Sequence, residues 1–276
     1  MVELPGRGTT FVREVEGPPG APTVVLLHGW TANSALNWFA AYEPLGEHFR
    51  VVALDHRGHG FGMRSWKRFR LEDCADDVVA LADVLGVGRF VAVGYSMGGP
   101  IAQLTWQRHP DRVSGLVLCA TARNFNGKPG ERAVFGVIAG LTVVARATSH
   151  DVRRRVAERV TVARYDDNPL GRWARAQSRL NDVRSVLEAG QALSRFSSKE
   201  WIGQVDVPTA VLVHTRDVTV PIARQRKLAD AIPGARTYEV DGPHDVCATD
   251  PDAFVPVLVD ACLAITGAAA GGADQA

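Results

Sequence analysis

The sequence predicts an α/β protein with a mostly parallel central sheet, helices on both faces of that sheet and an inserted all-helical lid. Three observations lead to this prediction. Short, β-branched apolar runs alternate with helical segments along most of the chain. Most of these runs are apolar on both faces, as strands are when helices cover both sides of a sheet. One long region, from about 121 to 203, contains only helical patterns.

The apolar runs predict the strands of the sheet in chain order. Six of them are expected at 22–29, 49–55, 89–96, 112–121, 208–215 and 235–240. Residues 9–17 (TTFVREVEG) are expected to add an antiparallel strand at the edge. Because helical segments separate the six runs, we predict right-handed crossovers between parallel strands.

Helices are predicted where apolar residues recur three and four positions apart. Residues 71–86 carry one such stripe and end at a glycine. In the insert, a single helix face is predicted from Trp173, Ala176, Leu180, Val183, Leu187 and Gly190. The resulting domain prediction is a core of residues 1–121 and 204–267, a helical lid over 122–203 and a disordered tail over 268–276.

Composition narrows the function classes. The 276 residues carry a net charge of +1, which gives no indication of nucleic-acid or acidic-membrane binding by the chain as a whole. Neither a secretory signal nor an apolar run long enough to span a bilayer is visible, so a cytoplasmic location is expected. Residues 146–184 differ, with ten arginines against five acidic residues. Solvated helix faces or attraction of anionic substrates would both explain that excess.

Cysteines and histidines give no metal-ligand pattern. The four cysteines lie far apart without a CxxC pair, which favours buried free thiols. His56 and His59 share one loop, but a metal site there lacks a third ligand. We therefore expect no metal and no organic cofactor. The oligomeric state is left open by the sequence.

Residues 94–98 (GYSMG) fit the pattern G-x-S-x-G at the point where a predicted strand meets a helical segment. This motif requires a sharp strand-to-helix turn, in which glycines relieve steric crowding. Such a turn would raise the Ser96 hydroxyl above the carboxyl edge of the sheet, where ligands bind in open α/β folds. Ser96 is therefore predicted as a nucleophile. From the motif alone, a glycine-rich turn with an inert serine stays an alternative.

A serine hydroxyl is a weak nucleophile until a base removes its proton. His244 lies in a loop just after the last predicted strand and is expected to be that base. Asp217 lies just beyond the strand 208–215, at the same edge of the sheet, and can orient the imidazole. His28 ends the first core strand, where its ring is expected to support the loop instead.

With Ser96, Asp217 and His244 in this order, the chain resembles the α/β-hydrolase fold superfamily. The resemblance is to the lidded group of serine esterases, cofactor-free haloperoxidases (perhydrolases) and C–C bond hydrolases, and it covers nearly all of residues 20–265. It implies that Ser96, Asp217 and His244 form a catalytic triad. Further matching loops are LLHGW at 26–30, ALDHRGHGFG at 53–62, RDVTVP at 216–221 and DGPHDV at 241–246.

The matching loops imply roles for further residues. LLHGW resembles the family's oxyanion loop, which implies that the backbone N–H of Trp30 joins that of Met97 in an oxyanion hole. The loop 53–62 departs from the family pattern at Gly62, where serine is commonest, and the histidine loop departs from it by placing Pro243 before His244. His214 occupies a position where glycine is common, and no role for it follows from the sequence.

The expected function is hydrolysis of small to medium carboxylic esters through an acyl-Ser96 intermediate. Perhydrolysis or C–C bond cleavage by the same triad, and a non-catalytic ligand receptor on the same scaffold, remain alternatives. Trp38, Phe125 and Trp173 are predicted as pocket walls from position alone. The apolar run 133–145 is expected either to line an acyl pocket or to bury its face on the sheet domain.

Overall fold

The computed structural model describes residues 1–127, 129–149, 151–152, 155 and 167–267. The predicted tail over 268–276 therefore lies outside the described residues. A seven-stranded sheet forms the centre of the molecule, in the order β3-β5-β4-β6-β7-β8-β9. Only β3 pairs antiparallel, with β5; the other neighbouring pairs are parallel. The predicted mostly parallel sheet is confirmed.

All six predicted strands are present. They are β4 (Thr23–Leu27), β5 (Arg50–Leu54), β6 (Phe90–Tyr95), β7 (Val113–Cys119), β8 (Thr209–His214) and β9 (Arg236–Val240). Every residue of β6 and β8 is buried, as expected of strands covered on both faces.

The edge strand predicted over 9–17 is two strands. β2 (Gly8–Thr10) pairs with β1 (Val2–Leu4) in a separate two-stranded sheet, and only β3 (Val12–Val15) joins the main sheet. The predicted antiparallel edge strand is confirmed in β3, whereas Thr9 and Thr10 belong to β2, because the partner of β2 lies on the chain segment before it.

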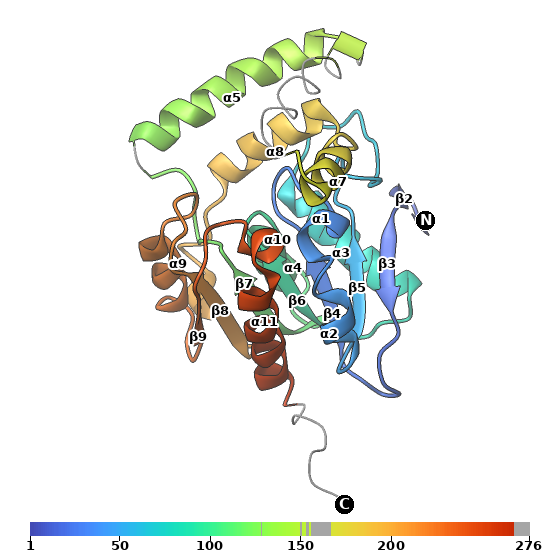
Figure 1. Cartoon of the computed structure of the whole chain (residues 1–276), viewed down its shortest axis with the longest axis vertical. Coiled ribbons are helices and arrows are strands. Elements are labelled where there is room, and N and C mark those ends of the chain that lie inside the picture. The colour runs from blue at the N-terminus through green and yellow to red at the C-terminus, as the bar shows by residue number, and fades with distance from the viewer. Residues whose placement is uncertain (128, 150, 153–154, 156–166, 268–276) are drawn as a thin grey trace, which may run out of the picture.

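Helices cover both faces of the sheet, and each face has its own hydrophobic core. One core includes side chains of α3 (Leu71–Val84), α4 (Gly98–Arg108) and α9 (Ile222–Ala229). The other core includes side chains of the helices α1 (Ser34–Trp38), α2 (Tyr42–Gly46), α10 (Val246–Thr249) and α11 (Pro251–Thr266). Figure 1 shows α2 and α11 together in front of the sheet.

The α-helices with described bounds between β7 and β8 are α5 (Pro129–Ala147), α7 (Pro169–Ser178) and α8 (Val183–Arg195), and the short 3-10 helix Ile202–Gln204 follows them. The single helix predicted from Trp173 to Gly190 was wrong, because it breaks between α7 and α8. Asp182 starts the second helix, where its side chain accepts a hydrogen bond from the Ser185 N–H at 2.8 Å.

In the segment predicted as a lid, the helix α5 lies outermost and contacts α8 (Figure 1). It was expected to line a pocket or to bury its apolar face on the sheet domain, but several of its valines are exposed. The sheet domain cannot cover this face because α8 lies beneath α5. Of the helices built from the described residues, none has the length and apolar character needed to cross a bilayer.

Candidate active site

Ser96 lies at the sharp turn between β6 and α4. Its φ is 51°, in the left-handed region that residues with a side chain rarely adopt. The turn is possible because glycines stand on either side: a Cβ added at Gly94 would lie 2.3 Å from the Gly98 carbonyl oxygen. The predicted strand-turn-helix context is therefore present.

The structure brings the three predicted triad residues into one hydrogen-bonded chain. Ser96 Oγ lies 3.0 Å from His244 Nε2, and His244 Nδ1 lies 2.7 Å from Asp217 Oδ2. The histidine comes from the loop after β9 and the aspartate from the loop after β8. With the proton on Nδ1, His244 donates to Asp217 and presents Nε2 as an acceptor for the serine proton.

The Asp217 carboxylate is fixed by further donors. Its Oδ1 accepts the backbone N–H groups of Thr219 and Val220, each at 2.8 Å, and its Oδ2 accepts Gln225 Nε2 at 3.1 Å. The Asp217 side chain has no exposed surface. Because a buried carboxylate is stabilised by donors directed at it, this arrangement holds the oxygen that faces His244 in place.

Tyr95 and His214 support the histidine loop, and no role for either was predicted from the sequence. The Tyr95 hydroxyl donates to the His244 carbonyl oxygen at 2.6 Å. His214 Nδ1 lies 3.3 Å from the carbonyl oxygen of Pro243, the residue by which this loop departs from the family pattern. Burial lowers the pKa of His214 to about 4, so this ring is neutral and packs behind the loop.

The oxyanion loop lies against the serine. A Cβ added at Gly29 would lie 3.4 Å from Ser96 Cβ, and Met97 directly follows Ser96 at the start of α4. Within the described part of the chain, the backbone N–H groups of Trp30 and Met97 have no protein acceptor. These N–H groups can therefore serve the oxyanion role predicted for them.

Asn37 fixes the same loop from α1. Its Oδ1 accepts the Gly29 N–H at 2.8 Å, and its Nδ2 contacts Cys247 Sγ at 3.5 Å. The side chain is buried, so it connects the oxyanion loop with the helix that follows the histidine loop. No sequence motif pointed to Asn37, although a buried asparagine in a five-residue helix implies partners in the tertiary structure.

A cluster of three buried histidines lies behind the oxyanion loop. The rings of His28 and His56 are 4.3 Å apart, and those of His28 and His59 are 5.4 Å apart. Burial lowers the pKa of His28 to about 4 and that of His59 to about 3. His28 Nε2 accepts the His56 N–H at 2.9 Å, which is the loop support predicted for it. Among the described residues, no group of three or more potential ligands is arranged to hold a metal ion.

The predicted pocket walls lie in different surroundings. Trp38 is fully buried in the second hydrophobic core, with its ring 5.9 Å from that of Tyr95, so it belongs to the core and lines no open pocket. Trp173 is half-buried and its ring meets that of Phe39 at 5.3 Å. Phe125 is half-buried against the first core.

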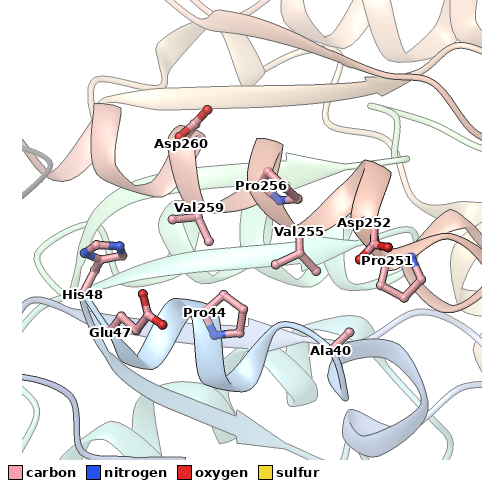
Figure 2. A pocket seen from close by; sticks show the side chains of 10 residues that line it. All are labelled: Ala40, Pro44, Glu47, His48, Pro251, Asp252, Val255, Pro256, Val259 and Asp260. Carbon is pink, nitrogen blue, oxygen red and sulfur yellow. The ribbon is translucent and has the colours of Figure 1, made fainter.

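A groove of about 510 Å³ lies between α2 and α11, on the surface formed by these two helices (Figure 2). The residues that line it are Ala40, Pro44, Glu47, His48, Pro251, Asp252, Val255, Pro256, Val259 and Asp260. None of the predicted site residues is among them. The groove is therefore separate from the site around Ser96.

Similarity to known proteins agrees with this architecture. The chain is 29% identical over 249 residues to the bifunctional esterase/perhydrolase DCH of Acinetobacter calcoaceticus, a match that covers 85% of this chain and 89% of that protein. It is 27% identical to the poly(3-hydroxyalkanoate) depolymerase of Ectopseudomonas oleovorans, with 88% of this chain and 85% of the relative covered. Among solved structures, the enol-lactonase of Burkholderia xenovorans is similar, at 27% identity and a TM-score of 0.76, with 92% and 96% of the two chains covered.

The family model for the alpha/beta hydrolase fold matches residues 22–251, which include the strand-turn-helix at Ser96 and both loops that face it. The match and the observed sheet order agree with the resemblance predicted from the motifs. The chain therefore belongs to the alpha/beta hydrolase fold family.

Proposed function

We propose that this hydrolase cleaves small to medium carboxylic esters with Ser96 as nucleophile, His244 as general base and Asp217 as the acid that orients it. The observation that carries the proposal is the continuous hydrogen-bonded chain from Ser96 Oγ through His244 to Asp217. An aspartate at the position of Ser96 would favour attack on an epoxide or a haloalkane. A serine favours acyl transfer instead.

In the proposed reaction, Ser96 Oγ attacks the ester carbonyl carbon while His244 Nε2 takes the hydroxyl proton. The negative charge that develops on the carbonyl oxygen is stabilised by the N–H groups of Trp30 and Met97. His244 then gives its proton to the leaving alcohol, and the C–O bond breaks to leave an acyl-Ser96 ester. Water, deprotonated by the same histidine, hydrolyses that ester and restores the serine.

The names of three relatives support an ester-type substrate. They are an esterase/perhydrolase, a poly(3-hydroxyalkanoate) depolymerase and an enol-lactonase. Polyesters and lactones both contain an ester carbonyl carbon that an activated serine can attack, and the adjoining acyl C–O bond is the one that breaks. We propose that the helices over 122–203 act as a lid that limits acyl length, which favours small and medium acyl groups.

Perhydrolysis is a second candidate, because one relative is named for both activities. The acyl-Ser96 ester would then transfer its acyl group to hydrogen peroxide instead of water, giving a peracid. Peracid formation from acetate ester and peroxide, measured beside hydrolysis of the same ester, separates the two reactions. Cleavage of a C–C bond or non-catalytic ligand binding would give neither product.

Ser96→Ala is the direct test. We expect the turnover of p-nitrophenyl butyrate by this variant to be at least about a thousandfold lower than that of the wild type, because the nucleophile is removed while the binding groups remain. A fluorophosphonate should add its mass to the Ser96 peptide of the wild-type protein only. Ser194→Ala, at a lid serine bonded to the Gln191 carbonyl oxygen, is the matched control and should keep full turnover.

Three results would contradict the proposal. They are turnover by Ser96→Ala within a few-fold of wild type, loss of activity in a chelator, and faster turnover of long-chain emulsified esters than of short soluble ones.

A further inference from the structure

The outer face of α5 is apolar and uncovered. Val134, Val137, Leu141 and Val144 recur at intervals of three and four residues, and their side chains are 58%, 64%, 50% and 61% exposed. On the opposite face, Ile138 is buried where α5 contacts α8. We refer to the four exposed residues as the outer stripe.

The outer stripe belongs to a helix without charges in its middle. No charged residue occurs between Arg132 and Arg146. A helix that is apolar on all sides is normally covered on all sides, and a contiguous exposed apolar patch marks an interaction surface. Figure 1 shows α5 as the outermost helix of the lid, with α8 on its inner side. The outer stripe therefore needs a partner from outside the described part of the chain.

A second exposed segment adjoins the lid. In the loop 61–70, Trp66 is 88% exposed. Glu188 of α8 connects this loop to α5, since its carboxylate accepts the Phe69 N–H and Arg146 Nε, each at 2.8 Å. The loop contains no acidic residue and four cationic ones: Arg64, Lys67, Arg68 and Arg70.

Charge distinguishes between the partners that could cover this surface. Two copies that met through the outer stripe and the adjoining loop would bring the four cations of one loop 61–70 towards those of the other, which opposes association. An anionic surface with an apolar interior matches both the cations and the outer stripe.

We propose that the outer stripe and the loop 61–70 dock this protein on the surface of an anionic lipid bilayer. The helix α5 would lie in the plane of the interface with its valines and leucine in the acyl region, as apolar helix faces flanked by cations do. Trp66 would sit at the level of the headgroups, where indole rings are favoured, and the loop cations would contact phosphate groups. The proposal concerns where the protein binds and is independent of the ester substrate.

Sedimentation of the full chain with vesicles tests the docking. We expect binding to phosphatidylcholine vesicles that contain phosphatidylglycerol, and at least about tenfold weaker binding to phosphatidylcholine alone. Added salt should weaken binding because it screens the headgroup charge. Val137→Glu/Leu141→Glu should lower the partition coefficient at least about tenfold, since two charges would enter the apolar region. Val84→Glu, at a valine of α3 that is 44% exposed, is the matched control and should bind as wild type does.

Further variants keep the test decisive. Lys67→Gln/Arg68→Gln changes only exposed side chains, so it should fold normally and lose both affinity and salt dependence. Ser96→Ala should bind vesicles like wild type, which separates this result from the proposed esterase reaction. The proposal is overturned if anionic vesicles do not bind the protein, or if both double variants bind unchanged. It is also overturned by a combination of two results. Sedimentation velocity would show that the wild-type protein is a dimer and that Val137→Glu/Leu141→Glu is a monomer, and this variant would still bind vesicles.

Discussion

Ser96 has a strained backbone conformation, which hydrogen bonds with neighbouring residues maintain. A non-glycine residue with φ near 51° costs on the order of 1–3 kcal/mol. Three hydrogen bonds fix the turn: the Ser96 N–H donates to the Cys119 carbonyl at 2.9 Å, and the Ser96 carbonyl accepts the Thr121 hydroxyl at 2.8 Å and the Gly99 N–H at 3.0 Å. The hydroxyl is thereby kept within reach of His244 without a further conformational change.

Asp217→Asn tests the acid at the scale of one residue. An asparagine cannot stabilise the charged imidazole and can favour the wrong tautomer, so kcat should fall by about three to four orders of magnitude. Asp245→Asn is the matched comparison, because Asp245 is exposed and lies next to His244 in sequence. Its kcat should stay within about twofold of wild type in the same p-nitrophenyl ester assay. The opposite ranking would move the acid into the histidine loop.

At the scale of elements, the turn between α7 and α8 connects the lid to the loops around the site. Asn181 Oδ1 accepts the Gly60 N–H at 2.7 Å, and its Nδ2 donates to the Thr31 carbonyl at 2.8 Å. Thr31 follows Trp30 and has a positive φ of 65°. The Trp30 indole in turn donates to the Val186 carbonyl of α8 at 2.7 Å. The helical insert therefore holds the C-terminal end of the predicted oxyanion loop, at Trp30 and Thr31.

Asn181→Ala should affect activity more than stability. Loss of two half-buried hydrogen bonds should cost about 1–3 kcal/mol of unfolding free energy. Because the Thr31 carbonyl would lose the donor that Asn181 supplies beside Trp30, we also expect kcat/KM to fall at least about tenfold. Asn168→Ala removes the N-cap of α7, where the Asn168 side chain accepts the Gly171 N–H at 2.7 Å, and should cost about 1 kcal/mol with little change in kcat/KM. Equal kinetic losses in the two variants, measured beside their unfolding curves, would contradict this role.

At the scale of the whole molecule, buried neutral histidines make folding dependent on pH. The pKa values of His28 and His214 are lowered to about 4 and that of His59 to about 3, in each case chiefly by burial. Below about pH 6.5 the unfolded chain takes up protons that these buried rings do not accept. The unfolded state is therefore favoured as the pH falls from about 6.5 towards 4.

We expect a marked loss of stability in mild acid. At about pH 5.5 each of the three rings should lower the unfolding free energy by about 1.2 kcal/mol relative to neutral pH. Urea unfolding at the two pH values measures the difference. His59→Gln should reduce the difference, because one buried imidazole with a lowered pKa is removed. Unfolding free energies that are equal at both pH values would contradict this account.

The sequence by itself determined the strand order along the chain, the turn at Ser96 and the three residues that meet there. These features depend on local signals: β-branched apolar runs, glycines around one serine, and polar residues placed just beyond strand ends. Parallel strands bring their carboxyl ends to one edge, so residues far apart in sequence could be expected to meet.

Only the tertiary structure decided which side chains pack against which. Trp38 lies in the core because Tyr95 and Phe254 surround it, although its position in the sequence also suited a pocket wall. The partners of Asn37 include Gly29 and Cys247, the latter 210 positions away. The apolar run 133–145 predicted a helix with a buried face, but α8 lying beneath α5 decides which of its side chains are buried and which are exposed. Such contacts depend on where whole elements lie in space, and periodicity within one element carries no information about that.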